Sequence, residues 1–246
     1  MRYSLIFICL VFSPFSLQAK CDDEAKASVN WTGCDKSNLD LSGVDLQGAV
    51  LRRVDFSNSN LSKARLQNAD LSFSKLENTK FLATRLEHAR FNNSKITHAD
   101  FSSAVIDSAR FSRAVIKQTT FASSRLNKTD FYEAKVDTSQ FEKAQIEKAN
   151  FSRAKLVSAN FKNTMGKEAI FNQADLENAD FTAANLESAK FVQANLLNTK
   201  FNQADLSGAS IQGAVIDGAS FSDAKLSSTI WVKYKRCRNG SVGVCE

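Results

Sequence analysis

The hydrophobic residues of this chain recur at every fifth position. From Leu41 to Trp231 there are 39 such positions, here called ladder positions, and all hold Leu, Phe, Ile, Val or Trp except Gly166. The residue two positions before each is mostly Ala, Ser or Thr, and the other three positions carry nearly all the charged and amide side chains. Neither the period of about 3.6 residues of a helix nor the period of two of a strand explains this spacing.

A fixed repeat that continues without an insertion over about 190 residues indicates a solenoid. Side chains two residues apart on an extended segment point to the same side, so the ladder residue and the small residue before it should both face inward. The other three positions should face water. Each group of five residues is therefore predicted to form one side of a coil, followed by a turn.

The repeat unit is clearest in residues 69–73, with the sequence Ala-Asp-Leu-Ser-Phe, and in residues 204–208, with Ala-Asp-Leu-Ser-Gly. Such blocks resemble the pentapeptide-repeat proteins, and the resemblance covers about four-fifths of the chain. It implies an all-β fold, namely a right-handed quadrilateral parallel β-helix with four repeats per coil and about ten coils over residues 39–231. It implies almost nothing about activity.

Phenylalanine occupies every second ladder position between Phe81 and Phe201. With twenty residues per coil, this alternation predicts two columns of phenyl rings on opposite walls, so the aromatic residues belong to the core and form no ligand platform. Gly166 interrupts the aliphatic positions. It is interpreted as a packing defect partly filled by Met165 or Ile170, and the alternative is a bulge that creates a binding notch.

Residues 1–19 are predicted to be a cleaved signal peptide. Arg2 precedes an apolar run at residues 5–12 that is too short to span a membrane, and Ala19 suits cleavage. Lipidation at Cys21 is the alternative, but Lys20 stands where a lipobox needs a small residue. No other segment predicts a membrane span. The mature protein is therefore expected to be periplasmic or secreted.

Four cysteines remain after the signal peptide, two on each side of the repeats. Because no disulfide can bridge the length of the rod, the preferred pairs are Cys21–Cys34 in an N-terminal cap (residues 20–38) and Cys237–Cys245 in a C-terminal cap (residues 232–246). A metal site is the rival interpretation, but no histidine accompanies either pair.

The caps should cover the exposed ends of the core, as terminal units of solenoids do. Val29 and Trp31 share the inward register and are predicted to plug the first coil, and residues 231–234 are predicted to plug the last. Asn239-Gly240 predicts a tight turn. Gyrase-binding members of the resembled family commonly dimerise through an apolar C-terminal end, and a disulfide-closed end disfavours such a dimer here.

One face of the predicted coils is basic. It would carry seven cations and two aromatic residues against Asp70, Asp130 and Glu133, which favours binding of an acidic protein, an anionic glycan or nucleic acid. The alternative is an ordinary surface that is basic by chance. Leu197, an outward apolar residue, is a second candidate. The predicted binding face comprises Arg52, Arg53, Phe73, Arg90, Arg110, Arg113, Tyr132, Arg153 and Lys190.

No phosphate-binding loop, metal-ligand spacing or nucleophile motif is present, and the two histidines, His88 and His98, should lie on opposite faces. The repeats also carry no inserted loop that would wall a cleft. We therefore expect a non-catalytic protein without a cofactor, acting as a rigid scaffold that binds an unknown protein partner or has a purely structural role. The alternative is binding of an anionic glycan or nucleic acid by the basic face, and of these two nucleic acid is the less expected.

A topoisomerase-interacting protein that mimics DNA is the least favoured alternative. The resemblance implies that gyrase-inhibiting members are acidic rods. This chain has a formal net charge of +6, and loss of Arg2 with the signal peptide leaves +5. Export would also separate the protein from cytosolic gyrase. The sequence leaves the oligomeric state open.

Overall fold

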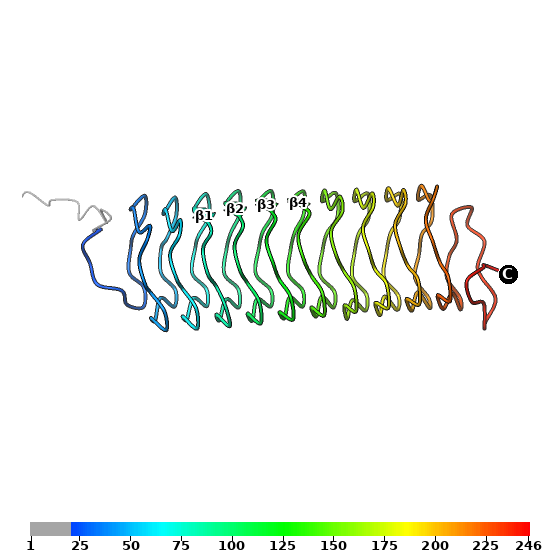
Figure 1. Cartoon of the computed structure of the whole chain (residues 1–246), viewed down its shortest axis with the longest axis horizontal. Helices are drawn as coiled ribbons and strands as arrows, with labels where there is room; N and C mark the ends of the chain where they lie inside the picture. Colours follow the sequence, from blue (N-terminus) through cyan, green and yellow to red (C-terminus); the bar gives the residue numbers. More distant parts are fainter. Residues whose placement is uncertain (1–20) are drawn as a thin grey trace, which may run out of the picture.

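The repeats wind into a single long rod. The computed structural model describes residues 21–246, so the predicted signal peptide lies outside the described residues. Figure 1 shows the coils stacked side by side along one axis, with the first described coil at one end and the C-terminus folded against the other. Among these residues, no helix has the length and apolar character needed to cross a membrane.

The coils stack in a constant register of twenty residues. Parallel bridges join residues twenty apart from Asn30↔Val50 to Ser210↔Ile230. On one side the backbone forms a parallel sheet in the order β1-β2-β3-β4, in which Leu76 lies beside Ile96. Five residues per side and twenty per coil confirm an all-β quadrilateral parallel β-helix. The strands are β1 (Lys75–Glu77), β2 (Lys95–Thr97), β3 (Val115–Lys117) and β4 (Lys135–Asp137).

The corners are tight turns, as predicted, but the spacing alone did not reveal their conformation. At most of them the carbonyl of the ladder residue accepts the N–H three residues later, as from Ala49 to Leu46 at 3.1 Å. The residue two after the ladder position has a positive φ, even where it is bulky, as at Phe73 with 63°. Asn and Gly are frequent at this position because they tolerate this conformation.

The acidic or amide residue before a ladder position completes the turn. In these turns the N–H just after the ladder residue finds no backbone carbonyl in residues 21–246, and the Asx side chain accepts it, as Asp40 does from Ser42 at 3.0 Å. The hydrogen bonds from Ser42, first from its backbone N–H, lower the pKa of Asp40. The pKa of Asp180 is also lowered. Burial alone would raise it, but the hydrogen bonds from Thr182 and Lys162 have the larger combined effect. This explains the Asp or Asn of the repeat unit.

Two columns of phenyl rings fill the interior, as the alternation predicted. Phe141 stacks on Phe121 and Phe161 with centroids 4.9 and 4.7 Å apart, and it meets Phe131 and Phe151 edge-on at 6.1 and 5.8 Å. These rings are fully buried. Edge-to-face contact between two parallel-stacked columns is the favoured arrangement of aromatic rings, and it ties the opposite walls of each coil together.

At the N-terminal end, Cys21 is disulfide-bonded to Cys34. Trp31 is buried, meets the edge of Phe56 at 6.4 Å, and has the ammonium of Lys36 4.0 Å from its ring centroid. Val29 is buried beside it in the core cluster. Trp31 and Val29 therefore plug the first coil, as the inward register indicated.

The C-terminal cap reverses the chain direction. After Trp231 the chain turns back and pairs antiparallel with the last coil at Ile230↔Arg236 and Lys225↔Val242. Cys237 and Cys245 form the second preferred disulfide. The N–H of residue 241 donates to the carbonyl of residue 238 at 3.2 Å, so the predicted turn at Asn239-Gly240 is present. The antiparallel segment covers hydrogen-bonding edge that the last coil would otherwise expose.

The predicted plug at residues 231–234 is only partly correct. Trp231 packs on Phe221 with ring centroids 5.1 Å apart. Tyr234, however, is 74% exposed. It occupies the turn that reverses the chain and has a positive φ of 61°, so its ring points away from the core.

Removing one core ring should destabilise the rod far more than removing a surface ring. Phe151→Ala deletes a fully buried side chain that four other phenyl rings contact, and we expect a loss of roughly 3–5 kcal/mol of unfolding free energy. The matched control is Phe73→Ala, since that ring is 45% exposed and, among the described residues, contacts only two arginine side chains as ring partners; its expected loss is at most about 1–2 kcal/mol. Urea denaturation measures both, and equal losses would contradict the proposed core.

Candidate functional site

The predicted basic face is partly neutralised by ion pairs. Arg52 lies 3.8 Å from Asp70, and Glu133 joins two arginines from neighbouring coils, Arg113 at 2.9 Å and Arg153 at 3.7 Å. Chiefly because Arg113 donates a hydrogen bond to it, the pKa of Glu133 is lowered, and the same hydrogen bond raises the pKa of Arg113. Three of the seven predicted cations are therefore engaged with acids on the same face.

The two aromatic residues of this face also lie against arginines. Phe73 lies between Arg52 and Arg53, whose guanidinium carbons are 5.8 and 5.6 Å from the ring centroid. The guanidinium of Arg153 donates to the hydroxyl of Tyr132 at 3.1 Å and lies 5.9 Å from its ring. Such contacts contribute about 0.5–1 kcal/mol each at exposed sites. They make local surface clusters and no continuous stacking platform.

Arg90 and Arg110 are different. They are exposed bridge partners in adjacent coils, and neither makes an ion pair within residues 21–246. The two acids in the same row are already engaged. Asp70 pairs with Arg52 and accepts the N–H of residue 72 at 3.0 Å, and Asp130 accepts hydrogen bonds from residues 112 and 150 at 2.6 and 2.8 Å.

A polar groove of about 250 Å³ opens beside these two arginines. Its lining is completed by Asn68, His88 and Ser108. The groove runs along the corner between two sides of the coil, the side of Leu86 and the side of Phe91. Asn68, His88 and Ser108 belong to one side of the coil, and Arg90 and Arg110 belong to the next. Because the sequence assigned outward residues to one side at a time, these three residues were not predicted as part of the site. The available signal was that His88 and Arg90 are only two residues apart across one corner.

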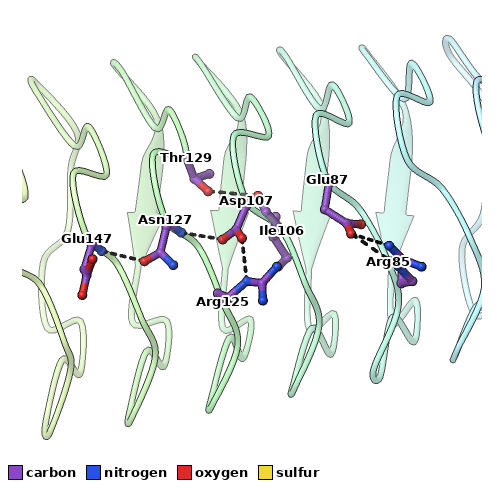
Figure 2. Close-up of polar contacts among 8 residues, drawn as sticks. All are labelled: Arg85, Glu87, Ile106, Asp107, Arg125, Asn127, Thr129 and Glu147. Atoms are coloured by element: carbon purple, nitrogen blue, oxygen red, sulfur yellow. Dashed lines mark hydrogen bonds and ion pairs between the residues drawn. The ribbon is translucent and has the colours of Figure 1, made fainter.

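A second groove, of about 500 Å³, continues along the rod from the first and shares Ser108 with it. Polar side chains in its lining accept hydrogen bonds from backbone N–H groups of the next coil. Figure 2 shows Asp107 accepting the backbone N–H of Asn127 at 2.9 Å, and Asn127 accepting that of Glu147 at 3.0 Å. Asp107 also pairs with Arg125. With both signs of charge present, this groove has the character of an ordinary solvated surface.

The structure shows no bulge and hence no bulge-made binding notch at Gly166, and Met165 is not the residue that fills the position. The backbone passes through it without a bulge, because Gly166 donates to the next coil at 2.7 Å and the bridges of Met165 keep the twenty-residue register. Met165 is 51% exposed and does not fill the space. The side chains of Ile146 and Leu186, from the coils on either side, fill it instead: a Cβ on Gly166 would lie 3.2 and 3.1 Å from them.

The remaining sequence candidates give no site. Leu197 is only partly exposed, so it forms no apolar patch on its own. Within residues 21–246 no group of three or more potential metal ligands comes together. Lys190 is exposed on the predicted face and forms no ion pair with the described residues, but it lies several coils from Arg90 and Arg110.

Models of one family match the whole repeat region. The model for pentapeptide repeats (8 copies) matches residues 40–78, 69–107, 167–196, 179–218 and 189–227, and the model for a pentapeptide repeat region matches residues 95–171. The chain therefore belongs to the pentapeptide repeat family, as the repeat blocks had indicated. A search of curated proteins found no match.

Solved pentapeptide repeat proteins are similar to the chain at low identity. HetL from the cyanobacterium Nostoc sp. strain PCC 7120, involved in heterocyst differentiation regulation, is 23% identical over 87% of this chain and 93% of its own, with a TM-score of 0.49. A trypsin-treated form of QnrB1, a plasmid-mediated fluoroquinolone resistance protein, is 19% identical over 74% and 87%, with a TM-score of 0.48. Likenesses this distant carry no functional conclusion for the present chain.

Restoring the missing ladder residue should not stabilise the rod. Gly166→Leu would place a side chain where Ile146 and Leu186 already lie, and overpacking of this kind costs about 1–3 kcal/mol. Adding Leu186→Ala, which trims one neighbour, should recover part of the loss. Denaturation of the two variants measures both effects. A more stable Gly166→Leu protein would show that the position is an empty cavity.

Proposed function

We propose that this protein is an exported, non-catalytic scaffold whose rigid sides bind a protein partner. The observation that carries the proposal is the uninterrupted stack of coils from Asn30 to Ile230 with a disulfide-bonded segment at each end. Since every coil packs on its neighbours through a filled core, surface side chains are held at fixed spacings of about 4.8 Å along the rod. Such a surface is suited to recognition of another folded protein.

The disulfides support export. Structural disulfides persist in the periplasm and outside the cell, and are rare in the cytosol. Cys21–Cys34 and Cys237–Cys245 lie in the two caps, so oxidation fastens the ends of the solenoid, where fraying would begin. Together with the predicted signal peptide at residues 1–19, this favours a periplasmic or secreted protein.

Ion pairing favours a protein partner over an extended anionic polymer. A nucleic acid or a long glycan would need a continuous row of free cations, because its affinity comes from neutralising successive negative charges. On the basic face, Arg52, Arg113 and Arg153 already have carboxylate partners. A net charge of +5 after loss of the signal peptide also disfavours DNA mimicry.

The first test concerns export. The full chain is expressed in a Gram-negative bacterium, the cells are fractionated, and the protein is analysed by intact mass and non-reducing peptide mapping. We expect a periplasmic product that begins at Lys20 and contains both cap disulfides. A cytosolic product with residues 1–19 retained and five free thiols would contradict the exported part and restore the topoisomerase alternative.

The second test concerns the binding side. A photo-crosslinking residue is placed in turn at Lys143, Lys148, Arg153 and Ser158, four exposed and equivalent corners of one coil, and the series is repeated at the same four corners of other coils. A scaffold should crosslink to one protein from one or two adjacent sides. Equal crosslinking from all four sides, or none from any coil, would contradict the proposal. Turnover of a substrate abolished by a single carboxylate substitution would indicate an enzyme.

A further inference from the structure

We propose that the corner groove lined by Arg90 and Arg110 binds a tetrahedral oxoanion, the phosphate or sulfate group of an ester. The proposal is independent of the scaffold function, because a small anion can bind whether or not a protein partner does. It rests on the groove that this arginine pair lines and on the contrast with the stacked pair Arg65 and Arg85.

The backbones of the two arginines are held side by side, and both residues line the groove. Arg110 donates its backbone N–H to the carbonyl of Ala89 at 2.9 Å and accepts that of Phe91 at 2.7 Å, so Arg90 and Arg110 occupy adjacent positions of one row. Adjacent strands are about 4.8 Å apart, and like charges at such positions repel each other. A shared anion would remove this repulsion and accept hydrogen bonds from both side chains.

Other stacked arginines on this rod already have an acid. Arg65 and Arg85 occupy the same repeat position in adjacent coils, and they pair with Asp45 at 3.3 Å and Glu87 at 3.0 Å (Figure 2 shows the second pair). Glu133 lies between Arg113 and Arg153 and contacts both. Glu133 therefore shows that one anionic group can form ion pairs with arginines from the coils on either side of it. Arg90 and Arg110 have no such group in residues 21–246.

The groove itself contains donors and no carboxylate. His88 supplies a ring N–H, Ser108 a hydroxyl and Asn68 an amide, the groups that commonly bind phosphate or sulfate beside arginine. The backbone N–H groups of His88 and Arg90 are used within the coil stack, at 3.0 and 2.9 Å. Recognition would therefore depend on side chains alone.

The size of the groove fits a small charged group with part of its ester. Its volume of about 250 Å³ is several times the roughly 30 Å³ that one water occupies in the liquid. The groove is open, so the rest of an ester-bearing molecule would extend into solvent along the rod. Because arginine binds planar pairs of oxygens in a bidentate manner, two arginines can hold three or more oxygens of one tetrahedral anion.

The test is an NMR titration of the ¹⁵N-labelled mature protein with inorganic phosphate and with inorganic sulfate, each at low chloride. We expect saturable shifts confined to the residues that line the groove. The variant R90Q/R110Q should bind each anion at least about ten-fold more weakly, because hydrogen bonds to charged groups are lost. The matched control is R65Q/R85Q, which removes the same two charges from an equivalent stacked pair and should bind as the unsubstituted protein does.

Thermal denaturation of both variants checks that the fold is intact. Equal weakening in the two variants would reveal general charge attraction and overturn the proposal, as would shifts that do not saturate. Glucose 6-phosphate and glucose 6-sulfate then serve as ester probes. Tighter binding of the sulfate ester would indicate a sulfated glycan, and tighter binding of the phosphate ester a phosphorylated sugar or headgroup. Failure of both esters to bind, with inorganic anions bound, would overturn the assignment to an ester.

Discussion

The packing of each residue on the residue twenty positions later holds this protein together. At Phe141 the backbone N–H donates to the carbonyl of Asn160 at 2.7 Å, while the ring stacks on Phe161 at 4.7 Å. The hydrogen bonds and the rings thus repeat in one register. A single inserted residue would misalign both, because side chains change sides when the register shifts by one. The ladder therefore tolerates no insertion over about 190 residues.

The same register organises the surface. Outward residues twenty apart lie beside one another, so the chain forms rows in which the charge of one coil meets the charge of the next. Lys167 pairs with Glu187 at 2.9 Å and Lys225 with Asp205 at 3.3 Å in this way. Each such exposed pair contributes at most about 1 kcal/mol, and many cations of the described residues, among them Lys95, Lys128 and Lys200, form no ion pair. Arg90 and Arg110 differ because they are stacked in adjacent coils, line one groove and share no acid within residues 21–246, and this combination identifies a candidate site.

The sequence predicted the interior well and the surface poorly, for a physical reason. Ladder residues such as Phe141 face a core in which only one register buries them, so a period of five specifies their positions. The partners of exposed arginines depend on rotamers and on residues of neighbouring coils, which no periodicity encodes. Arg113 and Glu133 were predicted to share one face, but the ion pair between them was not predicted. The corner groove was missed because it joins residues of two sides.

The defects of the repeat were the hardest to predict. At Gly166 the absent side chain is replaced by Ile146 and Leu186, whose reach across coils depends on the packing of the whole interior. At Tyr234 the repeat ends and the chain reverses, so the inward register no longer applies. Left-handed corners could have been inferred from the frequency of Asn and Gly at one position of the unit, since these residues adopt positive φ most readily.

The most direct test of this account is residue-resolved amide hydrogen exchange across the coils. A single continuous stack of coils predicts strong protection of ladder amides along the whole rod, including Gly166, Phe141 and Phe171, because each donates a hydrogen bond to the next coil. It also predicts fast exchange just after a ladder position that lacks an Asx side chain, as at Leu82, and slower exchange at Thr182, which donates to Asp180. Fast exchange of the ladder amides near Gly166, dividing the rod into two independently opening halves, would contradict the single continuous stack.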